Sequence, residues 1–113
     1  MENTFSEVKI FQVKPDKISE FEELIKQISK EQQKLDGFLT SSCLKRFYIF
    51  DKIDEPPREL TKIVKCIKYF MYNEFDSIQT YAFYTKWFFE KYYKTIIKLL
   101  LAPFDINCGK TIF

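Results

Sequence analysis

Residues 81–104, "YAFYTKWFFEKYYKTIIKLLLAPF", hold nine aromatic residues and a run of aliphatic ones. The stretch has the length of a membrane span, but five charged residues interrupt it. Four of them recur every four residues and form one solvated stripe of a helix: Lys86, Glu90, Lys94 and Lys98. We therefore expect a long amphipathic helix over about residues 75–101, ended by Pro103, and no membrane segment.

A first helix is predicted within "KPDKISEFEELIKQISKEQQKLDG", residues 14–37. Pro15 stands at its start, Asp16 can contribute to an N-cap, and Gly37 ends it. Apolar residues recur at helical spacing and predict one buried stripe: Ile18, Phe21, Leu24, Ile25, Ile28 and Leu35.

Four segments read as strands. Residues 6–13, "SEVKIFQV", alternate and are rich in β-branched residues. Residues 38–50 and 61–73 predict a hairpin with a long loop, because Pro56–Pro57 between them cannot continue a ladder. Residues 104–113 predict a short final strand.

The predicted order is β-α-β-β-α-β in one domain covering residues 1–113. This is the α+β, ferredoxin-like arrangement, an antiparallel four-stranded sheet with both helices on one face. The second and third strands are apolar on both faces over much of their length. Since a solvated face would be polar, we expect a homodimer through the open sheet face.

Composition excludes several kinds of function. Net charge is +2 with the two signs interspersed and no basic cluster, so no nucleic-acid partner is expected. Cys43, Cys66 and Cys108 form no C-x-x-C pair, and the start of the chain has no signal peptide, so a reduced, cytoplasmic protein is expected. The two glycines, Gly37 and Gly109, provide no phosphate loop.

The absence of His limits the chemistry further. A Ser–His or Cys–His nucleophile pair is excluded, and no metal site is expected, since the three cysteines lie on different predicted strands. Cys43 and Cys66 could still face each other across the hairpin. The simplest interpretation of each cysteine is a small buried hydrophobe.

Four stretches together resemble a known family: "VKIFQVKPDKISEFEELI", "LDGFLTSSCLKR", "YFMYNEFDSIQTYAFY" and "LLLAPFDI". In order and spacing they are similar to the antibiotic biosynthesis monooxygenase-like (ABM) domains of the dimeric α+β barrel superfamily. The resemblance implies a homodimer with an apolar pocket between helices and sheet in each subunit. Its members include cofactor-independent oxygenases of aromatic compounds, haem-degrading oxygenases, and proteins with no known activity.

This sequence departs from the haem-degrading branch, which uses an Asn, a Trp and a His. The first predicted strand lacks the Asn, the Trp position is best matched by Phe75, and the His position by Tyr84. With no imidazole to ligate haem iron, haem degradation is not expected, and we expect no cofactor. The acidic residue that ends the third strand in the family falls at Asn73 or Glu74.

The candidate catalytic residue is Tyr84, the polar group of an otherwise apolar wall. The predicted ligand-binding residues are Phe75, Phe83, Trp87 and Phe88; Tyr84, Trp87 and Phe88 fall on one flank of the second helix. Tyr69, Glu74 and Asp76 are further acid–base candidates. Ordinary core packing is the simpler explanation of the aromatic residues, and a helix N-terminus is the simpler explanation of Glu74 and Asp76.

Three functions therefore remain open. The first is a cofactor-independent monooxygenase, or related small oxidoreductase, acting on an aromatic, quinol-like ligand. The second is a non-enzymatic ligand-binding or sensory dimer that uses the same pocket. The third is a dimeric scaffold whose pocket is closed by its own rings.

Overall fold

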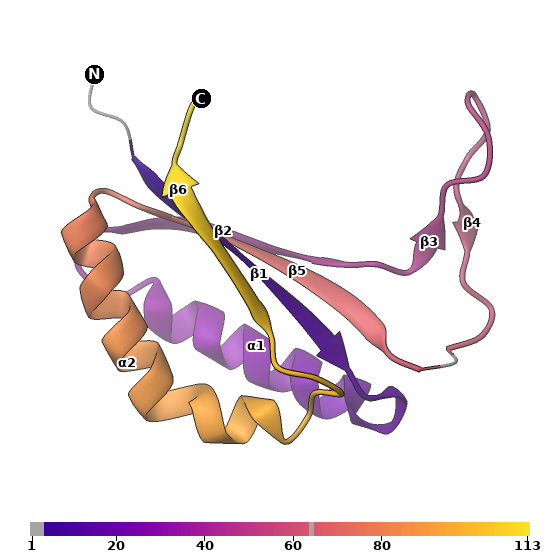
Figure 1. The fold of residues 1–113 in the computed structure, drawn as a ribbon, viewed down its shortest axis with the longest axis horizontal. Coiled ribbons are helices and arrows are strands. Elements are labelled where there is room, and N and C mark those ends of the chain that lie inside the picture. Colours follow the sequence, from indigo (N-terminus) through magenta and orange to yellow (C-terminus); the bar gives the residue numbers. More distant parts are fainter. Residues whose placement is uncertain (1–3, 64) are drawn as a thin grey trace.

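The structure is a computed structural model that describes residues 4–63 and 65–113. Its main sheet has four antiparallel strands in the order β2-β5-β1-β6, and helices α1 and α2 cover one face of it (Figure 1). The strands are β1 (Phe5–Val13), β2 (Phe38–Lys45), β5 (Ile67–Phe75) and β6 (Asp105–Lys110). The helices are α1 (Ile18–Gln32) and α2 (Ile78–Ile97). The predicted ferredoxin-like α+β arrangement is confirmed.

The first helix begins later than predicted. A 3-10 turn, Pro15–Lys17, precedes α1, and no side chain caps its first turn, so the N-cap role expected for Asp16 is wrong. The helix ends at Gln32, and Gly37 instead makes the turn into β2 with a φ of 82°. The predicted stripe does face the core, with Phe21, Ile25 and Ile28 buried and the other three partly buried against it.

The second helix, α2, is shorter than the predicted span of 75–101. It begins at Ile78 because the Ser77 side chain caps it, accepting a hydrogen bond from the backbone N–H of Thr80 at 3.1 Å. The four charged residues of the predicted polar stripe are all exposed. The described helices include none long and apolar enough to span a membrane.

The predicted hairpin of residues 38–50 and 61–73 is different in detail. Strand β2 stops at Lys45, and a separate two-stranded piece, β3 (Tyr48–Ile49) with β4 (Arg58–Glu59), projects away from the sheet and helices (Figure 1). Strand β5 starts only at Ile67, and residue 64 of the predicted strand lies outside the described residues. Cys43 is paired with Met71, so the possible approach of Cys43 to Cys66 across the hairpin does not occur. The interpretation of the cysteines as buried hydrophobes is wrong as well, because Cys43 and Cys108 are exposed and Cys66 is half-buried.

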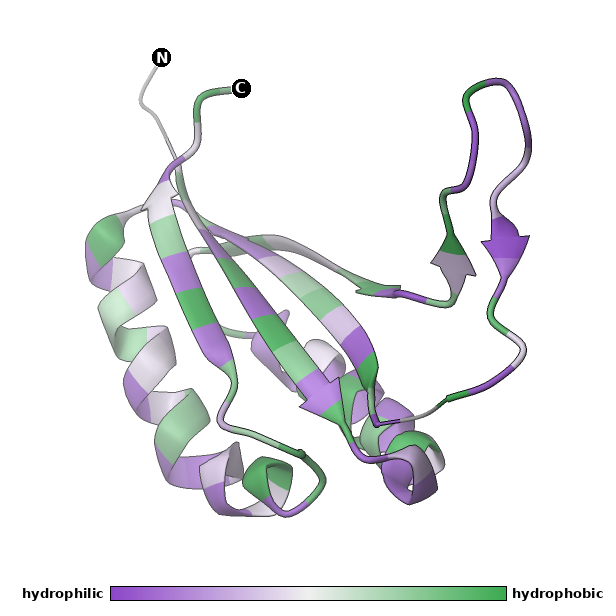
Figure 2. Cartoon of the chain, turned by 45° about the vertical axis from the view of Figure 1, so that its right-hand side comes forward, coloured by the Kyte–Doolittle hydropathy of each residue, from purple (hydrophilic) through white to green (hydrophobic). Residues whose placement is uncertain are grey.

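The core lies between the sheet and the two helices. Alternate residues of β1 and β5 point into it, and Figure 2 shows hydrophobic and hydrophilic residues alternating along the strands. The opposite sheet face carries Val8, Ile10, Phe70 and Tyr72, which are partly buried, and no described segment packs on it as a second layer.

Candidate functional site

A pocket of about 390 Å³ lies where the turn into β2 meets the start of α2. Its walls are mostly aromatic and aliphatic, with two polar residues: Leu35, Asp36, Phe38, Phe75, Thr80, Phe83 and Tyr84. Three of the residues predicted from the sequence, Tyr84, Phe75 and Phe83, therefore line one pocket. Trp87 and Phe88 do not line it. We call this space the α2 pocket.

Beside the α2 pocket, Tyr84 belongs to a buried polar cluster that the sequence analysis did not identify. Glu7 and Lys9 on β1, Gln32 on α1 and Asn73 on β5 are all fully buried. Lys9 Nζ donates to Glu7 Oε1 at 2.5 Å and to the Tyr84 hydroxyl at 2.6 Å. A buried ion pair is stable only when further hydrogen bonds satisfy both partners, and this cluster supplies them.

Amides and a second phenol complete the cluster. Asn73 Nδ2 donates to Glu7 Oε1 at 3.1 Å and, more weakly, to the Tyr84 hydroxyl at 3.4 Å. The hydroxyl of Tyr81 donates to Glu7 Oε2 at 2.6 Å, and Gln32 Nε2 donates to Asn73 Oδ1 at 2.9 Å. The side-chain oxygen of Gln32, Oε1, is also buried, and it accepts no hydrogen bond from any residue in the described ranges.

Aromatic rings surround the Lys9 ammonium. Its Nζ lies 4.1 Å from the centroid of Phe88 and 4.5 Å from that of Tyr84, within range of cation–π attraction. Trp87 packs on Tyr84 with centroids 6.0 Å apart. Phe88 and Trp87 thus lie close to Tyr84, as the helical spacing predicts. They pack against the Tyr84 ring and do not line the α2 pocket.

Burial changes the protonation of the two central groups. Desolvation lowers the pKa of Lys9 to about 8, against the opposing effect of the Glu7 carboxylate. Desolvation, with the charge of Glu7, raises the pKa of Tyr84 well above its usual value. At neutral pH, Tyr84 is therefore a neutral phenol that can donate or relay a proton, while Lys9 is a cation that becomes neutral in mildly basic solution.

The other predicted candidates lie elsewhere. The Tyr69 hydroxyl donates to Glu22 of α1, and this bond, added to burial, raises the pKa of Tyr69. Glu74, near the end of β5, accepts from Thr4, which precedes β1. Asp76 precedes the N-cap Ser77 and accepts at 2.6 Å from Thr80, which lies in the first turn of α2. Of the two family positions considered, Asn73 reaches the cluster and Glu74 does not.

The missed residues had a signal in the sequence. Glu7 and Lys9 share the alternating face of Phe11 and Val13, so a strand with a buried Phe11 must bury both charges. Gln32 continues the helical spacing of Phe21, Ile25 and Ile28, and Asn73 continues the alternation of Met71. The signal is therefore a polar residue at a position where strand alternation or helical spacing predicts a buried side chain.

Comparison with known proteins supports the fold. No family model matches the sequence, and no curated protein matches it. Among solved structures, a candidate antibiotic biosynthesis monooxygenase from Nitrosomonas europaea is 12% identical with a TM-score of 0.74, covering 100% of this chain and 95% of its own. A conserved protein from Methanosarcina mazei is 18% identical with a TM-score of 0.70, covering 96% and 93%.

A third solved structure contains a ligand. It is a monooxygenase from the gene ActVA-Orf6 of Streptomyces coelicolor in complex with nanaomycin D, 15% identical with a TM-score of 0.69, covering 98% of this chain and 89% of that one. At these identities the likeness concerns the fold, and it extends over nearly the whole chain. This chain has the fold of the antibiotic biosynthesis monooxygenase-like proteins.

Proposed function

We propose that the chain is a cofactor-independent monooxygenase, or a related small oxidoreductase, that acts on an aromatic, quinol-like ligand in the α2 pocket. The observation that carries the proposal is the junction between this pocket and the buried cluster. Tyr84 is part of the aromatic wall, and its hydroxyl bonds to Lys9. The pocket volume of about 390 Å³ falls in the range of small-molecule sites.

The proposed reaction takes place at an activated carbon of the ligand, a CH₂ attached to a phenol ring or a ketone. The oxidant is O₂. Loss of a proton gives an enolate, which passes an electron to O₂, and a C–O bond forms to give a hydroperoxide. Loss of water then leaves a carbonyl, so R₂CH₂ and O₂ become R₂C=O and H₂O. Such chemistry needs a proton acceptor in an apolar site more than it needs a cofactor.

Tyr84 is the proposed catalytic residue. While Lys9 is protonated it donates to the Tyr84 oxygen, and no described residue accepts the Tyr84 proton in return. That proton is free to bond a ligand oxygen. When Lys9 is neutral, the 2.6 Å contact can reverse, and a ligand proton can pass through Tyr84 to the amine. Phe75 and Phe83 would hold the ring of the ligand, and Trp87 and Phe88 would hold Tyr84.

The ligand class is supported by the S. coelicolor neighbour, a monooxygenase whose structure contains nanaomycin D. A homodimer is part of the same proposal. The sheet face opposite the helices carries a partly buried apolar row of Val8, Ile10, Phe70 and Tyr72, which a second copy would cover. Light scattering during gel filtration measures the mass, and a monomer of 13.7 kDa would contradict the dimer.

The experiment for the reaction is oxygen uptake with anthrone as the probe. We expect one O₂ consumed per quinone formed, and a rate that rises with pH toward about 8 as Lys9 loses its proton. Tyr84→Phe should lower the rate about 100-fold or more. Tyr93→Phe, a more exposed tyrosine of the same helix, is the matched control and should keep the rate. Turnover unchanged in Tyr84→Phe would remove Tyr84 from the mechanism.

One observation favours a second candidate, a ligand-binding or sensory protein of the same fold. The Tyr84 side chain is only 2% exposed, and its oxygen is already bonded inside the protein. A pocket wall of this kind can hold an aromatic ligand without reacting with it. Saturable binding of anthrone in the absence of oxygen, with no oxygen uptake above the uncatalysed rate, would support this candidate over the enzyme.

A further inference from the structure

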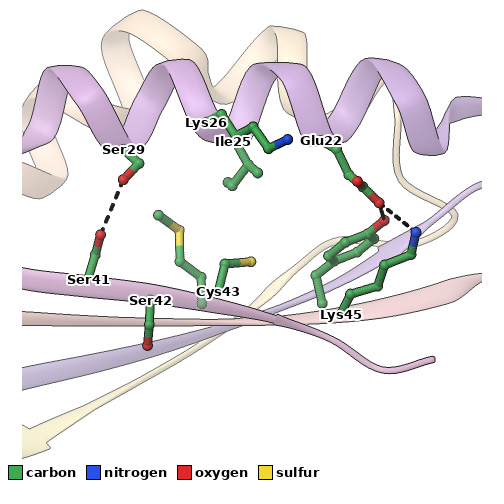
Figure 3. Close-up of a pocket in the computed structure, with 10 residues that line it drawn as sticks. Glu22, Ile25, Lys26, Ser29, Ser41, Ser42, Cys43 and Lys45 are labelled. Atoms are coloured by element: carbon green, nitrogen blue, oxygen red, sulfur yellow. Dashed lines mark hydrogen bonds and ion pairs between the residues drawn. The ribbon is translucent and has the colours of Figure 1, made fainter. Parts of the chain in front are cut away.

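A second pocket lies between α1 and the edge strand β2 (Figure 3). Its volume is about 280 Å³, and it shares no lining residue with the α2 pocket. We call it the α1–β2 groove. Nothing in the proposed oxidation uses it, so its role is a separate question.

The floor of the α1–β2 groove is apolar. Ile25 from α1 and Met71 from β5 both line it, and both are buried. Cys43 pairs with Met71 on the neighbouring strand and also lines the groove, and partial burial, with the nearby Glu22 charge, raises the pKa of its thiol to about 11. A neutral thiol adds to the apolar floor. This surface suits a compact hydrocarbon or aromatic body.

Both ends of the groove are polar, and one of them is already neutralised. Glu22 accepts from Lys45 at 2.7 Å and from the Tyr69 hydroxyl, so its charge has a fixed partner. At the opposite end, Ser29 and Ser41 approach each other at 3.4 Å, a weak contact that leaves both hydroxyls able to bond a ligand.

Lys26 is the group whose charge is not neutralised in this groove. It lines the space one helical turn from Glu22, and it forms no ion pair with any residue in the described ranges. With Glu22 held by Lys45, the groove has a net positive charge above an apolar floor. This combination selects an anion with a hydrophobic body.

We propose that the α1–β2 groove is a binding site for a small organic monocarboxylate, with the carboxylate at Lys26 and the apolar body against Ile25 and Met71. The small volume fits a ligand with one ring or a short chain. The proposal stands independently of the oxidation proposed for the α2 pocket.

The methionines offer a direct test, since the chain has only Met1 and Met71. In protein labelled with ¹³C at the methionine methyl groups, titration with benzoate should move the Met71 signal saturably. Benzyl alcohol, which has the same ring without the charge, should bind more weakly. Lys26→Gln, which adds no methionine, should weaken benzoate binding by about fivefold, the size of one partly exposed ion pair.

Lys30→Gln is the matched control, because Lys30 is a residue of the same helix outside the groove, and the change should leave binding unchanged. A Met71 signal that benzoate does not shift would overturn the proposal. So would equal affinity for benzoate and benzyl alcohol, or benzoate affinity that Lys26→Gln does not change.

Discussion

Lys9 on β1 and Tyr84 on α2 are 75 residues apart in sequence, and Lys9 Nζ lies 2.6 Å from the Tyr84 hydroxyl. This contact connects β1, one of the two inner strands of the sheet, to α2, the helix that contributes to the wall of the α2 pocket. Because both groups are buried, the bond acts in a medium where electrostatic interactions are stronger than in water. The same contact therefore affects stability and the proposed chemistry.

Tyr84→Phe should destabilise the fold as well as lower the proposed turnover. The change removes one acceptor from Lys9 and one from Asn73, so that each still donates to Glu7 but has one buried N–H left without an acceptor. We expect a loss of about 1–3 kcal/mol in the free energy of unfolding. Urea denaturation followed by circular dichroism measures it, with Tyr93→Phe as the control. A stability equal to that of the unmodified chain would show that water replaces the lost hydroxyl.

Lys9→Met should be more damaging than the loss of both charges together. The single change leaves the Glu7 carboxylate buried without its cation, at a cost of about 3–5 kcal/mol. In Glu7→Gln/Lys9→Met the buried charge is gone, and the new amide can accept from Asn73 through its oxygen while its NH2 donates to the Tyr81 hydroxyl. We expect the double variant to recover most of the loss in urea denaturation. A double variant less stable than Lys9→Met would contradict the account of this pair.

Stability should also depend on pH through Lys9. Its pKa is about 8 in the folded chain and 10.5 in the unfolded one, so between these values the unfolded state binds more protons. The Lys9 contribution to the free energy of unfolding should therefore rise with pH, by about 2 kcal/mol from pH 8 to pH 10. The raised pKa values of Cys43, Tyr69, Tyr81 and Tyr84 act in the opposite direction over the same interval, because these groups ionise at lower pH in the unfolded chain.

The measurement is the urea midpoint at intervals between pH 7 and pH 10, compared with Glu7→Gln/Lys9→Met. The double variant lacks the titrating amine, so between pH 8 and pH 10 the free energy of unfolding of the unmodified chain should gain about 2 kcal/mol relative to that of the double variant. Parallel curves for the two proteins would assign the pH dependence to other groups.

The sequence predicts this fold well because its elements have clear periods. The stripe of α1 and the alternation of β1 each identify one buried face, and the order of elements leaves few topologies. It predicts the site less well. Tyr84 was identified by its place in an aromatic helix, whereas Glu7 and Lys9 look like ordinary solvated strand residues until Phe11 and Val13 fix which face is buried.

Element boundaries were harder for a physical reason. The predicted strand of residues 38–50 continues in apolar residues past Lys45, but Phe50 is 71% exposed, because β3 leaves the sheet. A local pattern of apolar residues shows that a strand can form and does not show which partner it pairs with. The α2 pocket likewise depends on how the turn at Gly37 meets α2, a contact between segments far apart in the chain.

Gly37→Ala tests that turn. Gly37 has a φ of 82°, and a Cβ there would lie 2.5 Å from Thr80 Oγ1 and 2.6 Å from Asp76 Oδ1. These two side chains bond each other, and the backbone N–H of Asp76 donates to the Gly37 carbonyl at 2.8 Å, so the start of α2 cannot yield without losing these bonds. We expect a loss of at least about 1–2 kcal/mol in the free energy of unfolding, from the left-handed backbone alone.

Gly109→Ala is the matched control, since a Cβ at Gly109 would meet nothing within 4 Å and the position has no positive φ. Its stability should stay within about 0.5 kcal/mol of the unmodified chain. Because Phe38 and Thr80 line the α2 pocket on either side of this contact, Gly37→Ala should also weaken anthrone binding, whereas Gly109→Ala should not. Equal urea midpoints for the two variants would contradict this prediction. They would mean that the turn at Gly37 accommodates a side chain, and that the backbone beside the α2 pocket can move more than the close packing around Gly37 implies.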